Sequence, residues 1–159
     1  MPAPHLPADL QPGEAVLVSA CVLGHATRYR GDSNPDRELV AALQGRGVVI
    51  VPVCPEVLGG LPIPRPAAEP PAGDGRDVWA GRQPVLDARG ADVSEAFREG
   101  ARQALRLARR CGARYAFLKE RSPSCGVHRT HSGGGLAEGP GVAAAAREEA
   151  GLRVLPALP

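Results

Sequence analysis

Short apolar runs alternate along the chain with longer segments in which apolar residues recur every three or four positions. Continuous apolar runs typical of strands cover residues 15–20, 47–53, 114–120 and 152–156. Amphipathic periodicity typical of helices covers residues 36–45, 92–112 and 140–151. This alternation predicts a single α/β domain with a mostly parallel sheet flanked by helices, as in Rossmann-like folds.

Capping residues indicate where two of these helices begin and end. Asn34 and Pro35 are typical of an N-cap and a first helical position, and Gly45 is expected to end that helix. Asp92 and Glu95 have the spacing of a capping box at the start of the longest helix.

Two segments depart from the strand and helix rhythm. Residues 55–75 contain six prolines and four glycines, and we expect a long ordered loop, because long loops in compact domains are usually functional. Residues 77–90 have the pattern of a small β-hairpin with Gly81 in its turn.

Length and charge limit the classes of protein. A chain of 159 residues fits one core, and we expect a flexible N-terminus over 1–14 and the domain over 15–159. A net charge of +2 with scattered basic residues gives no indication of nucleic acid or membrane as a partner, and we expect neither. No stretch approaches the roughly 20 apolar residues of a membrane span, and the first fifteen residues contain no apolar run of the length that a signal peptide needs. We therefore expect a soluble, cytoplasmic protein.

Three of the four cysteines follow predicted strands. Cys21, Cys54 and Cys125 each come directly after or close behind such a strand, and the carboxyl ends of parallel strands meet at one edge of a sheet. Their spacing matches neither a dense disulfide framework nor paired zinc knuckles. Cys111 lies on the apolar stripe of its helix and is expected to be core.

Three converging thiols without a fourth suggest a metal centre with one open position. His128 or His131 could complete the coordination shell of a zinc ion, since imidazole and thiolate are both zinc ligands. A cubane iron–sulfur cluster could instead take three thiolates and leave one iron open. The spacing does not choose between these, and inert buried cysteines are a further reading.

Polar residues beside these cysteines suit acid–base chemistry. Glu56 lies two residues after Cys54, and Ser122 and Ser124 lie just before Cys125. Lys119, the only lysine, ends the strand before them. A carboxylate and hydroxyls next to a Lewis-acidic metal are groups that move protons and position water.

The motifs together resemble one protein family over about residues 15–151. They are "VSACVLG", "RYRG", "VPVCPEVLGGLPIPRPAAE", "DG" at 74–75, "FREGA" and "FLKERSPSCG". The family is a widespread bacterial one, long catalogued as a domain of unknown function, whose characterised members are thiouracil desulfidases. The resemblance implies a short, single-domain form of it. Two departures are Arg30, where relatives often carry aspartate, and the stretch "VHRTHSGGG" after the last cysteine.

The resemblance also implies a site and a reaction. It makes three residues ligands of a [4Fe-4S] cluster: Cys21, Cys54 and Cys125. Glu56 and Ser122 match the acid–base groups, and Ser124 and Lys119 are expected to bind the substrate. In the implied reaction the open cluster iron would bind the sulfur of a small thiolated nucleobase such as thiouracil, and removal of that sulfur would give uracil and sulfide. Cluster-assembly machinery is an implied partner. The alternatives are a sulfur carrier with the same cluster, a small Cys/His zinc hydrolase and a thiol-based binding protein without metal.

Overall fold

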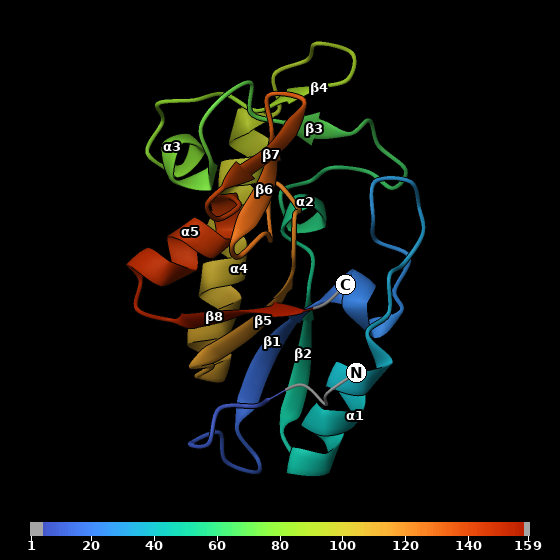
Figure 1. Cartoon of the computed structure of the whole chain (residues 1–159), viewed down its shortest axis with the longest axis vertical. Helices are drawn as coiled ribbons and strands as arrows, with labels where there is room; N and C mark the ends of the chain where they lie inside the picture. The colour runs from blue at the N-terminus through green and yellow to red at the C-terminus, as the bar shows by residue number, and fades with distance from the viewer. Residues whose placement is uncertain (1–4, 158–159) are drawn as a thin grey trace.

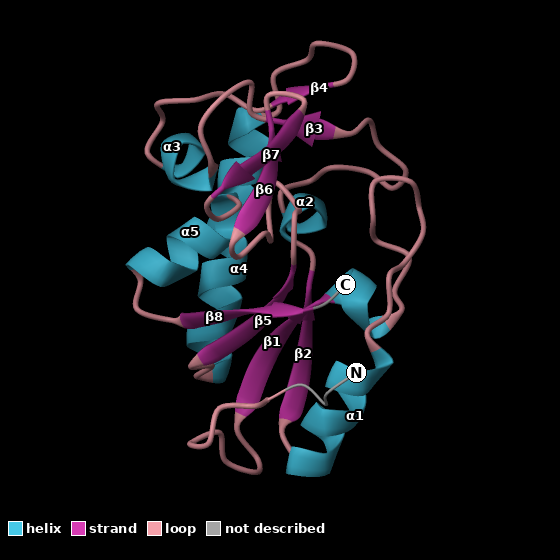
Figure 2. Cartoon of the chain, in the orientation of Figure 1, coloured by secondary structure: helices cyan, strands magenta, loops and turns pink. Residues whose placement is uncertain are grey.

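A four-stranded parallel sheet forms the centre of the computed structural model, which describes residues 5–157 (Figures 1 and 2). Its order is β2-β1-β5-β8, and each neighbouring pair is parallel. The strands are β1 (Ala15–Ser19), β2 (Val49–Val53), β5 (Tyr115–Lys119) and β8 (Arg153–Ala157). The predicted α/β fold with a mostly parallel sheet is confirmed.

Helices cover both faces of this sheet (Figure 1). They are α1 (Arg37–Arg46), α4 (Ser94–Cys111) and α5 (Val142–Glu149), with the short η1 (Ala20–Leu23), α2 (Pro55–Leu58) and α3 (Gly75–Trp79). Side chains alternate along β5: Tyr115 and Phe117 pack with α1, whereas Ala116 and Leu118 pack with α4 and α5. Burial on both faces explains why β5 reads as a continuous apolar run.

The continuous apolar run over residues 47–53 predicts a strand covered on both faces, but β2 is not covered in this way. It forms an edge of the sheet, and of its residues only Val53 is buried. Val49 at its start is 54% exposed. Pro52 fits this position, because an edge strand has one side on which no backbone donor is needed.

Both predicted helix caps are wrong by a few residues. The N-cap of α1 is Asp36, not Asn34, because the Asp36 carboxylate accepts a first-turn N–H. The helix ends at Arg46 with Gly47 as its C-cap, so Gly45 lies inside it. In α4 the predicted capping box is absent. Asp92 accepts from the N–H and hydroxyl of Ser94, and the Glu95 side chain instead pairs with arginines along its own helix.

The predicted hairpin over residues 77–90 is also wrong. Its first part belongs to α3, which starts at a capping box formed by Asp74 and Asp77. These reciprocal bonds satisfy free N–H groups and nucleate a helical turn where a strand was expected. The positive φ of Gly81, +82°, follows the end of α3 instead of turning a hairpin.

Two short antiparallel sheets stand above the main sheet (Figure 1). β3 (Ala68–Glu69) pairs with β4 (Leu86–Asp87), which ties the ordered Pro/Gly-rich loop to the segment after α3. β6 (Arg129–Ser132) and β7 (Gly135–Glu138) form the hairpin that the sequence did not indicate. The residues of β6 are all polar, although Thr130 and Ser132 are buried, and those of β7 are mostly exposed. Neither strand therefore shows the alternation of apolar and polar residues that predicts a strand.

The predicted flexible segment 1–14 lies partly outside the described residues. Within the described part, Leu10 is 1% exposed and belongs to the core on the α1 side. Asp9 and Glu14 both pair with Arg114. The flexibility of this segment stays a prediction. Among the described helices, none has the length and apolar character that crossing a membrane requires.

Candidate functional site

A cavity of about 1080 Å³ opens at the carboxyl ends of β1, β2 and β5. In this sheet the chain passes from β1 outward to β2 and later returns to the other side of β1 as β5. Open α/β sheets bind ligands where the strand order reverses in this way. The architecture therefore places a binding site between the ends of β1 and β5, beneath the two small sheets.

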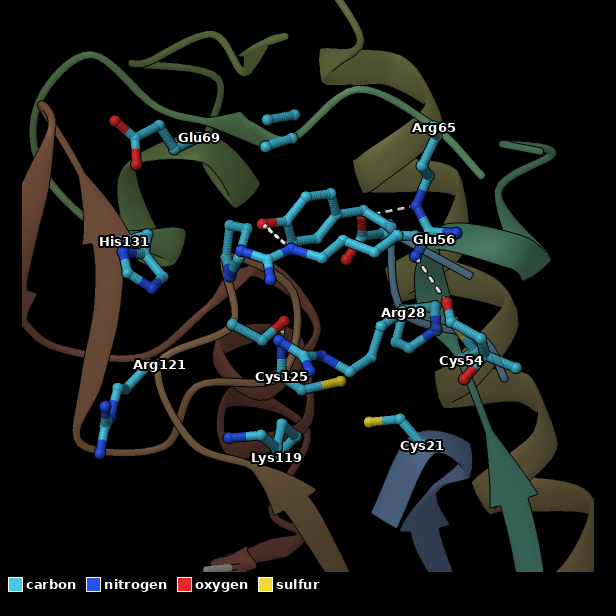
Figure 3. Close-up of a pocket in the computed structure, with 18 of the residues that line it drawn as sticks. Cys21, Arg28, Cys54, Glu56, Arg65, Glu69, Lys119, Arg121, Cys125 and His131 are labelled. Carbon is cyan, nitrogen blue, oxygen red and sulfur yellow. Dashed lines mark hydrogen bonds and ion pairs between the residues drawn. The ribbon is translucent and has the colours of Figure 1, made fainter. Parts of the chain in front are cut away.

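The three cysteines that follow these strands all line this cavity. Cys21 lies in η1, directly after β1; Cys54 follows β2 as the N-cap of α2; and Cys125 lies in the loop after β5. Figure 3 shows the sulfur atoms of Cys21 and Cys125 turned toward each other. The structure thus brings the predicted ligands together, while their binding of a metal stays a prediction.

All four cysteines are free thiols. Burial is the main cause of the raised pKa of Cys21, and the neighbouring Cys54 raises this pKa further. Burial raises the pKa of Cys125 to about 12. The sulfur of Cys54 donates to the carbonyl of Thr27 at 3.9 Å. The thiols of Cys21 and Cys125 therefore stay protonated in the absence of a cationic centre, and a bound metal would release their protons.

The donor set suits a cubane cluster. Three thiols that follow separate strands line one cavity, and a cubane cluster can take one thiolate at each of three irons. Among residues 5–157 no three His, Cys, Asp or Glu side chains are grouped so as to hold a single metal ion. Of the two histidines proposed for zinc, His131 lines the cavity, whereas His128 is not among the lining residues.

Cys111 lies away from the cavity, at the end of α4. It is partly buried and packs against the core between the sheet and α4. Its sulfur donates to the carbonyl of Ala108 at 3.5 Å, a bond within its own helix. This position agrees with a packing role.

Glu56 is held in one orientation by two partners at the cavity wall. Its Oε1 accepts from Arg65 Nε at 3.1 Å, and its Oε2 accepts from the Ser124 hydroxyl at 2.9 Å. The Arg65 side chain is only 4% exposed and also donates to the carbonyls of Pro62 and Thr27. A charge-assisted bond to a buried, fully engaged guanidinium is geometrically specific. Arg65 therefore fixes the carboxylate beside the three thiols.

The two serines have different partners. Ser122 Oγ accepts the backbone N–H groups of Ser124 and Cys125 at 3.2 and 3.1 Å, so it shapes the turn that carries the cysteine. Ser124 is 2% exposed and directs its hydroxyl to Glu56. Ser122 lines the cavity with the thiols, whereas Ser124 is not among the lining residues.

Cationic side chains line the same cavity (Figure 3). Burial lowers the pKa of Lys119, whose Nζ donates to the carbonyl of Glu120 at 3.3 Å. Arg28, Arg65 and Arg121 join it from three separate loops. The sequence did not single out these arginines, because they are scattered along the chain and form no cluster there.

Two glycines set the position of α2 against α4. A Cβ on Gly100 would lie 1.9 Å from the carbonyl oxygen of Pro55, and a Cβ on Gly59 would lie 2.0 Å from a carbonyl oxygen of α4. Neither helix has room for a side chain here. Since Pro55 stands between Cys54 and Glu56, this close approach determines where both functional side chains lie.

Gly100→Ala is therefore expected to destabilise the apoprotein by roughly 1 to 3 kcal/mol, the usual cost of overpacking. The urea midpoint measures this. Gly45→Ala is the matched control, because a Cβ there meets nothing within 4 Å and alanine in a helix is favoured by about 0.5 to 1 kcal/mol. If Gly100→Ala had the same urea midpoint as the wild type, α2 and α4 would be able to move apart without a loss of stability.

Comparison with known proteins agrees with this geometry. A family model described as 2-thiouracil desulfurase matches residues 16–157. The uncharacterized protein YbbK of Bacillus subtilis (strain 168) is 38% identical over 143 residues, which cover 88% of this chain and 93% of that protein. The solved structure of TudS, a [4Fe-4S]-dependent thiouracil desulfidase, is similar with a TM-score of 0.76 and 38% identity, covering 90% of each chain. The chain belongs to the 2-thiouracil desulfurase family.

Proposed function

We propose that this protein is a [4Fe-4S]-dependent desulfidase that converts thiolated pyrimidines such as thiouracil, with water, into uracil and hydrogen sulfide. The observation that carries the proposal is one cavity lined by three free cysteines from three strand ends and by a fixed carboxylate. The solved relative uses such a cluster and acts on thiouracil, as its name states.

In this proposal Cys21, Cys54 and Cys125 bind the cluster. A cluster held by three thiolates has one iron open to the substrate's sulfur and supplies Lewis acidity there. The three ligands come from separate elements, so the folded sheet positions them before the cluster is bound. The cluster itself is delivered by assembly machinery or by chemical reconstitution.

Glu56 is the proposed proton acceptor for the attacking water. Arg65 holds its Oε1, while Oε2 faces the Ser124 hydroxyl. The proton taken from water leaves with the sulfide, so the reaction needs no net electron transfer. Lys119 orients the pyrimidine. Ser124, for which the same role was predicted, does not line the cavity and acts instead through its hydrogen bond to Glu56. Ser122 acts as the second acid–base group, and it also maintains the turn that bears Cys125.

The test is an anaerobic assay of reconstituted protein with 2-thiouracil. We expect several turnovers of sulfide and an equal amount of uracil, without added reductant. Iron and acid-labile sulfide are measured in the same sample. Bound cluster with no uracil, or with at most one sulfide per chain, would contradict the hydrolytic reaction and favour a sulfur carrier. Colourless protein with stoichiometric zinc would favour the zinc hydrolase.

A further inference from the structure

Arg147 on α5 is a buried cation without a hydrogen-bonding partner. It is 0% exposed, and its three guanidinium nitrogens find no partner among residues 5–157. Burial lowers the pKa of Arg147 to about 10, which still leaves it charged at neutral pH. An uncompensated charge in the interior is strongly unfavourable. Such a residue needs a negative charge close by.

The structure places Arg147 behind Cys125. Backbone N–H groups at the start of α5 donate to carbonyls of residues 123–126, which fastens the helix to the loop that carries the cysteine. Ala144 packs in one core cluster with Cys125, and Arg147 lies one turn further along the same face of α5. A negative charge on Cys125 would raise the pKa of Arg147. Arg147 does not line the cavity, so substrate does not reach it.

We propose that Arg147 is the internal counter-charge of the Cys125 thiolate and thereby a positioning residue that stabilises the bound cluster. The inference rests on the proposed function, because Cys125 must be a ligand. When the Cys125 thiol is neutral, as in the apoprotein, the Arg147 guanidinium has no counter-charge. When Cys125 binds the cluster as a thiolate, the two buried charges offset each other. Outer groups of this kind typically alter metal affinity about 10- to 100-fold.

This role predicts opposite effects in the two forms of the protein. Arg147→Met removes an uncompensated charge from the apoprotein, so its urea midpoint should equal or exceed that of the wild type. In the loaded protein the same change should speed iron loss to a chelator by about 10-fold. It should also shift the cluster's reduction potential to a more negative value, because reduction adds negative charge beside the lost cation.

The experiment measures all three quantities in wild type, Arg147→Met and Arg147→Lys. Lysine keeps the charge and should restore most of the iron retention. Arg46→Met is the control: Arg46 is partly buried and, unlike Arg147, donates to backbone carbonyls of the N-terminal segment. This variant should lower the urea midpoint of the apoprotein and leave the rate of iron loss and the reduction potential unchanged.

Four results would overturn the inference. The first two are equal destabilisation of the apoprotein and the loaded protein by Arg147→Met, and failure of that variant to fold as apoprotein. The other two are an unchanged rate of iron loss and reduction potential in Arg147→Met, and an Arg147→Lys variant that behaves like Arg147→Met. Wild type that retains no iron would instead refute the proposed cluster, and this inference with it. Wild type that retains iron while Arg147→Met matches it would refute this inference alone.

Discussion

Glu56→Gln is expected to lower the rate of sulfide release from 2-thiouracil by about 100-fold or more, the scale of lost general acid–base catalysis. The cluster and substrate binding should be retained, because glutamine keeps the shape of the side chain. Its amide oxygen can still accept from Arg65 or Ser124, but it no longer takes a proton from water. Turnover is measured anaerobically, with iron determined per chain in each sample.

Glu138→Gln provides the matched control for this variant. Glu138 is likewise paired with an arginine, Arg129, but lies exposed on β7 outside the cavity lining. Its loss should leave turnover and iron content at wild-type levels. Unchanged sulfide release in Glu56→Gln with full iron content would remove Glu56 from the mechanism and make the sulfur carrier the better reading.

Cys125→Ala is expected to abolish iron binding, whereas Cys111→Ala should retain it. Cys125 lines the cavity with the other two proposed ligands, and two thiolates hold a cubane cluster poorly. Cys111 packs against the core beyond the cavity, so its loss should cost only about 1 kcal/mol of stability. Iron, acid-labile sulfide and the visible absorption after anaerobic reconstitution report the difference.

Unfolding of both cysteine variants in urea separates ligand loss from misfolding. Cys125→Ala should fold, because the thiol is a small buried group in the apoprotein. If both variants lost iron to the same extent, or if Cys125→Ala kept it, the ligand assignment would be wrong.

The sheet and the place of the three thiols were predictable from the sequence. β1 and β5 are buried on both faces, so each reads as a continuous apolar run that ends near a cysteine. Parallel strands end at one edge, and this rule alone brings Cys21, Cys54 and Cys125 to one side of the sheet. The burial of β2 was overestimated, because nothing in an apolar run tells an edge strand from a central one.

Local turn and cap signals were less decisive. Asn34 and Asp36 are both good caps, and the choice between them depends on where α1 packs against the sheet. Asp74 and Asp77 were read as loop and hairpin residues, although together they start α3. Each such residue has several local hydrogen-bonding solutions, and the surrounding structure selects one.

The sequence by itself determined the α/β fold, the strand ends and the residue types of the site, because burial and backbone geometry act locally along the chain. Only the tertiary structure decided their partners. Ser124 meets Glu56 across 68 positions, and Arg65 reaches the same carboxylate from a Pro-rich loop. Arg147 resembles any arginine near the end of an amphipathic helix, yet it lies fully buried behind Cys125. Long-range packing determines which charged side chains become buried, and the spacing of residues along the chain does not encode this.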